Sequence, residues 1–206
     1  MVSADQVASV LIARRGSWMD AWTLQKLLYY VQAWHAAITD EPLFPDTIKA
    51  YRDGPVVPEV RHSRKDRNSR RPSNQVVDGI EIDDTAAAVI DLVLAKYGTM
   101  SGGELVELTH TEQPWKDVRG DLPADAHSSI PMPVEAMARY FRSHGNLGGR
   151  TAADLAAGGV FVKPSASVER IDIDALLASL GSVGADEEKD PWGGANLVPA
   201  TGHDAL

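Results

Sequence analysis

Residues 20–39 read D-A-W-T-L-Q-K-L-L-Y-Y-V-Q-A-W-H-A-A-I-T. The apolar side chains recur at steps of three and four residues, at Leu24, Leu27, Leu28, Val31, Trp34 and Ile38. This spacing places them on one broad face of a helix. Asp20 can cap that helix, because its carboxylate accepts hydrogen bonds from the free amides of the first turn. We therefore expect a helix from about Asp20 to Thr39 that is central to the core.

Capping patterns predict further helices on both sides of this one. Ser3 with Gln6, and Ser101 with Glu104, have the spacing of a capping box, in which two side chains satisfy each other's backbone amides. Asp83 or Asp84 can cap another helix, and Pro58 suits a first helical turn. The expected helices cover residues 3–15, 20–39, 58 onward, 83–97, 101–110 and 133–144.

Helix breakers mark the connections between these helices. Residues 48–51 are short and lie between proline-containing breakers, which allows an extended segment. Gly54-Pro55 and Pro114-Trp115 are each expected to fix a chain reversal. The predicted fold class is therefore mainly α, a compact helical domain of about five to six helices with at most a minor extended or β element.

The composition changes after Gly145. Glycines then occur in pairs, and a short helix is expected only after Asp172. Acidic residues outnumber basic ones in this part and concentrate in Asp186-Glu187-Glu188-Lys189-Asp190. Such composition favours disorder, or docking on a partner. The sequence therefore predicts a helical domain over residues 1–145 and a glycine-rich, acidic C-terminal extension over residues 146–206.

Composition excludes several classes of protein. The 206 residues contain no cysteine, which removes thiolate metal sites and a cysteine nucleophile and fits a reducing compartment. No apolar run approaches the ~20 residues that a membrane span needs, and the N-terminus lacks a signal-peptide pattern. The net charge of −9 argues against a general nucleic-acid binder. We expect a cytoplasmic protein that does not enter a membrane.

No catalytic or cofactor-binding motif is recognisable in the chain. Phosphate-loop, dinucleotide-binding, nucleophile-elbow and zinc-helix patterns are absent, and the histidines do not pair at helical spacing. His35 is most simply a core histidine, and His110 with Glu112 a polar helix end. An enzyme would require His35 and His110 to converge on one pocket. We predict that the chain is not an enzyme, with no catalytic, cofactor-binding or metal-binding residue and no cofactor.

A basic segment interrupts this acidic chain. Residues 61–71 read R-H-S-R-K-D-R-N-S-R-R, in which six basic residues stand against the single acid Asp66. The segment can be a solvated face, or it can bind RNA or an acidic partner. Trp115 can similarly fill the core or anchor a partner, whereas Trp34 is expected in the core.

Two blocks of the sequence combine unusual polar and aromatic residues. The first block joins L-Q-K-L-L-Y-Y-V-Q-A-W-H (24–35), P-L-F (42–44) and I-K-A-Y-R-D-G-P-V-V-P-E-V (48–60). The second is M-S-G-G-E-L-V-E-L-T-H-T-E-Q-P-W-K (100–116). Together the two blocks resemble the Panacea domain of SocA-like antitoxins, which also occurs in phage-associated proteins. Tyr51 and Arg52 depart from the family pattern, which has a tryptophan and an aromatic residue before Gly-Pro-Val.

The resemblance implies a helical antitoxin that neutralises a co-encoded toxin by direct contact, in one family member as an adaptor that delivers the toxin to a protease. A nucleic-acid-binding regulator that uses Arg61 to Arg71 is the alternative. The motif residues with an expected structural role are Gln25, Lys26, Trp34, His35, Gly54 and Pro55. The residues expected to contact the partner are Arg52, Arg61, Arg64, Arg67, Thr109, His110 and Trp115.

Overall fold

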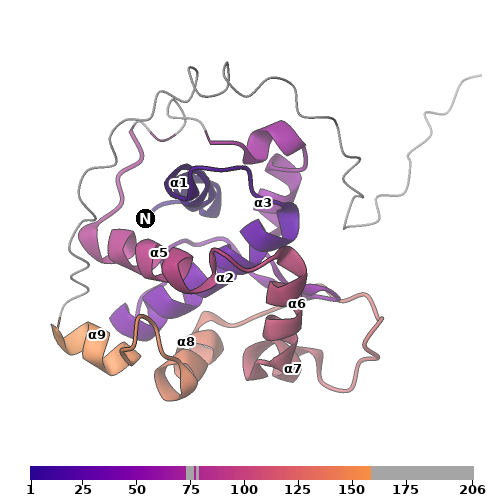
Figure 1. Ribbon diagram of the computed structural model, residues 1–206. Helices are drawn as coiled ribbons and strands as arrows, with labels where there is room; N and C mark the ends of the chain where they lie inside the picture. Colours follow the sequence, from indigo (N-terminus) through magenta and orange to yellow (C-terminus); the bar gives the residue numbers. More distant parts are fainter. Residues whose placement is uncertain (73–76, 78, 159–206) are drawn as a thin grey trace, which may run out of the picture. The chain divides into compact units, whose positions relative to one another are not determined.

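A computed structural model of the chain describes residues 1–72, 77 and 79–158. This part is mainly helical and holds one small antiparallel sheet (Figure 1), so the predicted fold class is confirmed. The helices are α1 (Ala4–Arg15), α2 (Ala21–Thr39), α3 (Pro58–Ser63), the short 3₁₀ helix η1 (Arg67–Arg70), α5 (Asp84–Tyr97), α6 (Gly102–Thr111), α7 (Gln113–Arg119), α8 (Val134–His144) and α9 (Ala152–Gly158). Among them, α7 and α9 add to the helices that the sequence predicts.

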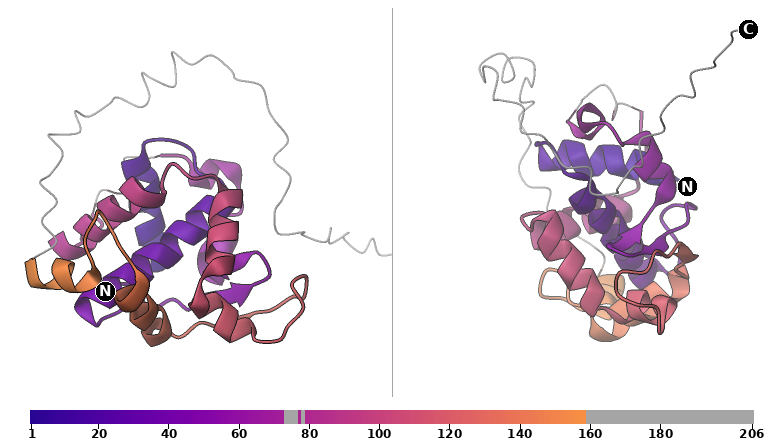
Figure 2. Two further views of the ribbon diagram at one scale, coloured as in Figure 1. Left: turned by 60° about the horizontal axis from the view of Figure 1, so that its bottom comes forward. Right: turned by 90° about the vertical axis from the view of Figure 1, so that its right-hand side faces the viewer.

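Helix α2 runs through the middle of the described part (Figures 1 and 2). It contacts α1, α3, α5, α6, α8, α9 and strand β2 (Gly54–Val56). Every residue from Thr23 to Ile38 is buried. The predicted helix and its central place in the core are confirmed, and burial extends beyond the apolar face because neighbours cover α2 on all sides. Its polar residues therefore need partners inside the protein.

The predicted helix caps are present. Ser3 and Gln6 form one capping box, and Ser101 and Glu104 form another. Asp20 accepts from the amide of Thr23 at 2.9 Å, and its carboxylate thereby begins α2. The first residues of α1, α2 and α6 are accordingly set by local sequence.

The sheet has the order β2–β1–β3, where β1 is Lys49–Tyr51 and β3 is Ile130–Pro131. Tyr51 pairs with Gly54, so the chain reverses at Arg52-Asp53. The prediction that Gly54-Pro55 forms this reversal is wrong, because both residues lie in β2. The second predicted reversal is also wrong, because Pro114 and Trp115 lie in the first turn of α7. A proline is tolerated there, since amides of the first turn have no hydrogen-bond partner within the helix.

The described chain continues into the core beyond Gly145. Leu147, Ala152 and Leu155 are buried, and α9 contacts α2 and α8. The domain boundary at Gly145 stays a prediction. The predicted helix after Asp172 and the acidic run lie outside the described residues. Within the described part, no helix has the length and apolar character needed to cross a bilayer.

We predict that a chain ending at Gly145 still unfolds cooperatively but is less stable than a chain ending at Gly158. Removal of the buried side chains of Leu147 and Leu155 should cost ~2–4 kcal/mol, because each forfeits the free energy of burial. Urea denaturation followed by circular dichroism measures the difference. Equal stability of the two chains would show that α9 contributes nothing to the core.

Candidate protein-interaction site

Two neighbouring polar residues of α2 hold strand β2 in place. The Oε1 atom of Gln25 accepts a hydrogen bond from the amide of Val57 at 2.7 Å. The Nζ atom of Lys26 donates to the carbonyl oxygen of Pro55 at 3.3 Å. Both side chains are buried, so these bonds satisfy backbone groups that water does not reach. The structural role predicted for Gln25, Lys26 and Pro55 fits these contacts.

Gly54 lies where α2, β2 and α6 meet. A Cβ atom at this position would lie 2.5 Å from Cε of Lys26 and 2.7 Å from Oγ1 of Thr109. The φ angle of Gly54 is +97°, which side-chain-bearing residues rarely adopt. Thr109 is fully buried, and its hydroxyl donates to the carbonyl of Val106 at 2.9 Å. We call Gln25, Lys26, Gly54, Pro55 and Thr109 the junction.

The Lys26 ammonium is the unusual group of the junction. Burial lowers the pKa of Lys26 to about 7, while the carboxylates of Asp53 and Asp20 act in the opposite direction. A buried charge is costly even when it is hydrogen-bonded. The burial of Lys26 therefore lowers the stability of the fold near neutral pH. The packing of α2 against β2 and α6 offsets this loss.

Three further candidate residues lie beside the junction. The rings of His110 and Trp115 stack with centroids 4.1 Å apart, and Nε1 of Trp115 donates to the carbonyl of Tyr51 at 2.9 Å. Burial lowers the pKa of His110, and the positive charge of Lys26 lowers it further. The guanidinium of Arg61 lies 5.8 Å from the centre of the Tyr51 ring. These contacts join α6, α7 and α3 to the hairpin that β1 and β2 form.

Arg52 occupies the reversal between β1 and β2. Its side chain is exposed and pairs with the adjacent Asp53 through bonds of 3.0 and 3.1 Å. Five of the seven predicted partner-binding residues therefore gather around the hairpin, namely Arg52, Arg61, Thr109, His110 and Trp115. Of these, Arg52 is exposed, Arg61 and His110 are half-buried, and Thr109 and Trp115 are buried.

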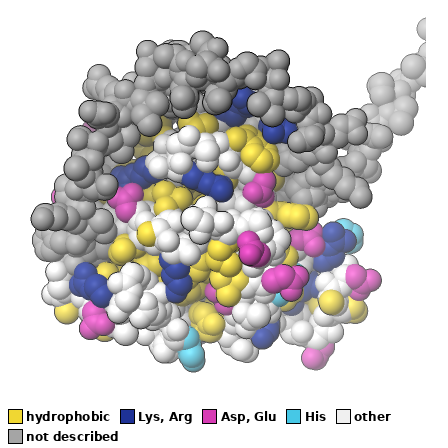
Figure 3. All heavy atoms as spheres, viewed as in Figure 1, with side chains coloured by type: hydrophobic (Ala, Val, Ile, Leu, Met, Phe, Trp, Pro, Cys, Tyr) yellow, Lys and Arg dark blue, Asp and Glu magenta, His cyan; other side chains and the backbone are white. Residues whose placement is uncertain are grey.

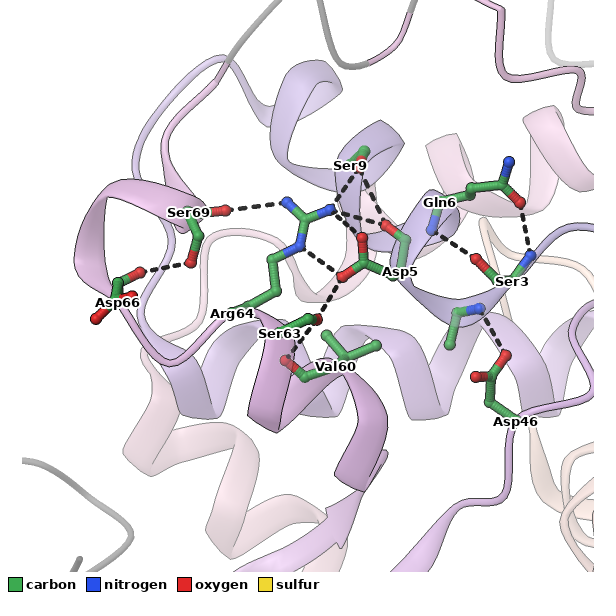
Figure 4. Close-up of polar contacts among 11 residues, drawn as sticks. Ser3, Asp5, Gln6, Ser9, Asp46, Val60, Ser63, Arg64, Asp66 and Ser69 are labelled. Atoms are coloured by element: carbon green, nitrogen blue, oxygen red, sulfur yellow. Dashed lines mark hydrogen bonds and ion pairs between the residues drawn. The ribbon is translucent and has the colours of Figure 1, made fainter.

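Arg64 and Arg67 lie elsewhere. The guanidinium of Arg64 donates to both carboxylate oxygens of Asp5, at 2.8 and 2.7 Å, and to the hydroxyl of Ser9 and the carbonyl of Ser69 (Figure 4). These bonds to Arg64 hold the pKa of Asp5 below its usual value. Arg67 lies over the ring of Trp18, 4.6 Å from its centre. These contacts of Arg64 are internal to the protein, and its role in partner binding stays a prediction.

The two histidines have separate surroundings. Nδ1 of His35 lies 2.9 Å from the carbonyl oxygen of Glu41, beside a cavity of about 520 Å³ that Leu43, Glu81 and Ile82 also line. His110 instead stacks on Trp115 at the hairpin. The structure therefore gives no support for a catalytic pair. Within residues 1–72, 77 and 79–158, no group of three His, Asp or Glu residues is arranged to hold a metal ion.

Sequence reasoning missed a second buried cluster, which is centred on an acid. Glu112, between α6 and α7, is 5% exposed and accepts from the hydroxyls of Tyr29 at 2.9 Å and Tyr30 at 3.1 Å. Burial raises the pKa of Glu112 to about 7. Tyr30 in turn stacks on Tyr97 of α5 with centroids 3.9 Å apart. The adjacent tyrosines of α2 gave no sign that both face one carboxylate.

Comparison with known families identifies this region. Residues 24–116 match the family described as antitoxin SocA-like, Panacea domain. Residues 24–116 are therefore similar to a SocA-like Panacea domain. The match begins at Leu24 and ends at Lys116, so it encloses both clusters around α2. No curated protein and no solved structure matches the chain. The Panacea domain supports a general antitoxin role, with a toxin as partner, in a family that is generally not enzymatic.

We predict that Gly54→Ala destabilises the Panacea domain by ~2–4 kcal/mol, because the new methyl group meets Lys26 and Thr109 at a φ that alanine avoids. Gly103→Ala is the matched control, since nothing lies within 4 Å of a Cβ at that position. Urea denaturation compares the two. A loss no larger for Gly54→Ala than for Gly103→Ala would contradict the close packing at the junction.

Lys26 should make stability depend on pH. Its pKa is depressed in the folded state to about 7 from the usual 10.5, so the unfolded chain binds more protons between these values. Stability should therefore rise between pH 7 and pH 9.5, with this residue adding at most about 1.4 kcal/mol per pH unit. Lys26→Met should reduce that rise. Parallel pH profiles of the two proteins would show that the lysine is not desolvated.

Proposed function

We propose that this Panacea-domain protein is an antitoxin that neutralises a toxin encoded next to it by direct protein contact. The observation that carries the proposal is the family match over residues 24–116, which coincides with the junction and its surroundings. Motif residues that look chemically capable, such as Lys26 and Thr109, are used there to hold segments together. The domain is then a scaffold that works through its surface.

The surroundings of the hairpin support a binding role. Trp115 holds the carbonyl of Tyr51, and α2 holds β2, so the Arg52-Asp53 turn projects from a braced support. A braced loop loses little conformational entropy when it binds. Exposed Arg52 and half-buried His110 are accordingly proposed as partner contacts, with Trp115 positioning them.

The nucleic-acid alternative gains less support. Two of the six basic side chains in the basic segment are engaged inside the protein. Arg64 binds Asp5, and buried Arg70 donates to backbone carbonyls. Fewer cations are then directed outward than the sequence suggests, in a chain whose net charge is −9. Phosphate binding depends on the number of such outward cations.

The test is co-expression with the product of the adjacent gene. We expect that product to arrest growth when expressed alone, to become harmless with this chain, and to co-purify with it. Gly103→Ala, away from any contact, should protect equally. A harmless neighbour, or two proteins that do not associate, would refute the proposal.

An adaptor role is a finer form of the same proposal and predicts a further result. If the antitoxin delivers its toxin to a protease, the toxin should persist in a strain that lacks the ATP-dependent proteases and vanish when they are present. Equal toxin levels in the two strains, with growth restored in both, would indicate neutralisation by binding alone.

A further inference from the structure

The basic segment is fixed to the body of the domain from inside. Buried Arg70 donates to the carbonyl of Met19 at 3.2 Å and to those of Arg64 and Lys65 at 2.7 and 3.0 Å. The amide of Met19 in turn donates to the carbonyl of Arg70 at 3.1 Å. Arg64 adds its bonds to Asp5 and Ser9 of α1 (Figure 4). Arg64 and Arg70 thus fix the backbone of the segment to the rest of the domain, and we call these two residues the clamps.

Three other cations of the basic segment lie at the surface. Lys65, Arg67 and Arg71 are exposed, while Asp66 is the one acid between residues 61 and 71. Exposed acidic residues occur instead on α6, at Glu104 and Glu107, and Figure 3 shows acidic side chains on that side of the molecule. We call Lys65, Arg67, Arg71 and Trp18 the arginine–tryptophan face.

Arg67 and Trp18 give this face more than charge. The guanidinium of Arg67 lies 4.6 Å from the centre of the half-buried Trp18 ring. An arginine held over an indole can pair with a carboxylate through two parallel bonds, with less loss of rotamer freedom. Tryptophan and arginine are also the residues that most often dominate the affinity of protein interfaces.

We propose that the arginine–tryptophan face binds a carboxylate-rich surface of the toxin. This inference rests on the proposed antitoxin function and adds a second toxin-binding surface to the one proposed at the hairpin. The clamps Arg64 and Arg70 hold the backbone of the face before binding, so little ordering is needed on association. A cavity of about 300 Å³ opens beside the face, with Asn68, Ser69 and Arg71 in its wall, and it gives room for a partner side chain.

Charge complementarity favours an acidic protein over a nucleic acid. Single-stranded nucleic acids bind by stacking bases on open aromatic faces, but Arg67 already covers one face of Trp18. Duplex binding needs many cations along a stripe, and the three exposed cations of this face, on a chain of net charge −9, provide few. A compact carboxylate cluster needs no more than these three.

The experiment uses the full chain co-expressed with the tagged product of the adjacent gene. The variant is Arg67→Glu with Arg71→Glu, and the control is Lys116→Glu with Arg139→Glu, which changes the net charge equally at exposed sites on α7 and α8. Thermal melting of all three proteins shows that they fold. Affinity is then measured at low and high salt, together with binding of a 20-base-pair DNA duplex.

We expect the Arg67/Arg71 variant to bind the toxin at least roughly tenfold more weakly than the control, with a smaller salt dependence, because reversed charges slow association and weaken the pairs. Wild-type affinity in this variant would refute toxin binding by the arginine–tryptophan face without contradicting the antitoxin function. Loss of duplex binding with unchanged toxin binding would overturn it in favour of nucleic acid. A wild-type chain that does not bind the neighbour overturns both proposals.

Discussion

The hydrogen bond from the amide of Val57 to the buried side chain of Gln25 is the contact on which the arrangement around α2 depends. It joins the residue that follows strand β2, which is also the N-cap of α3, to the central helix. Lys26 adds the bond to Pro55 on the next residue of α2. Gln32, further along the same helix, accepts hydrogen bonds from the amides of Leu43 and Phe44. Side chains of α2 thus form hydrogen bonds with the backbone of the segment that follows it in the chain. These bonds fix the position of the hairpin against α2.

Such internal bonds explain why a central helix carries glutamine and lysine. An unpaired backbone group costs ~1–3 kcal/mol when buried, and so a leucine at position 25 would leave the Val57 amide without a partner. The buried Lys26 and Glu112 oppose stability near neutral pH, since burial disfavours the charged form of each. Lys26 and Glu112 instead favour this fold over other arrangements of the segments, because a different arrangement would leave their buried polar groups without hydrogen bonds.

Local signals in the sequence were sufficient for the main helices and their caps. Asp20, Ser3 and Ser101 each begin a helix because one side chain meets amides within the same turn. The burial of α2 on all sides was not predictable from periodicity, since Gln25 and Lys26 interrupt the apolar pattern and look exposed. Tertiary contacts from α6 and β2 decide their environment.

The site was predictable only in part for the same reason. The family resemblance picked out the residues that meet at the hairpin, but it did not say that Thr109 and Trp115 are buried. Nor did the basic segment indicate that Arg64 and Arg70 turn inward, because a run of charges normally lies in solvent. The hairpin reverses at Arg52-Asp53 and not at the predicted Gly54-Pro55, because Gly54 pairs with Tyr51 in the sheet.

Amide hydrogen exchange at Val57 tests the central role of Gln25 most directly. A buried amide bonded to a side chain exchanges only when that contact opens. In the wild-type protein the Val57 amide should be strongly protected. In Gln25→Ala it should exchange much faster, while the amides in the middle of α5 keep their protection. Equal protection of Val57 in both proteins would contradict the account that α2 holds the hairpin through Gln25.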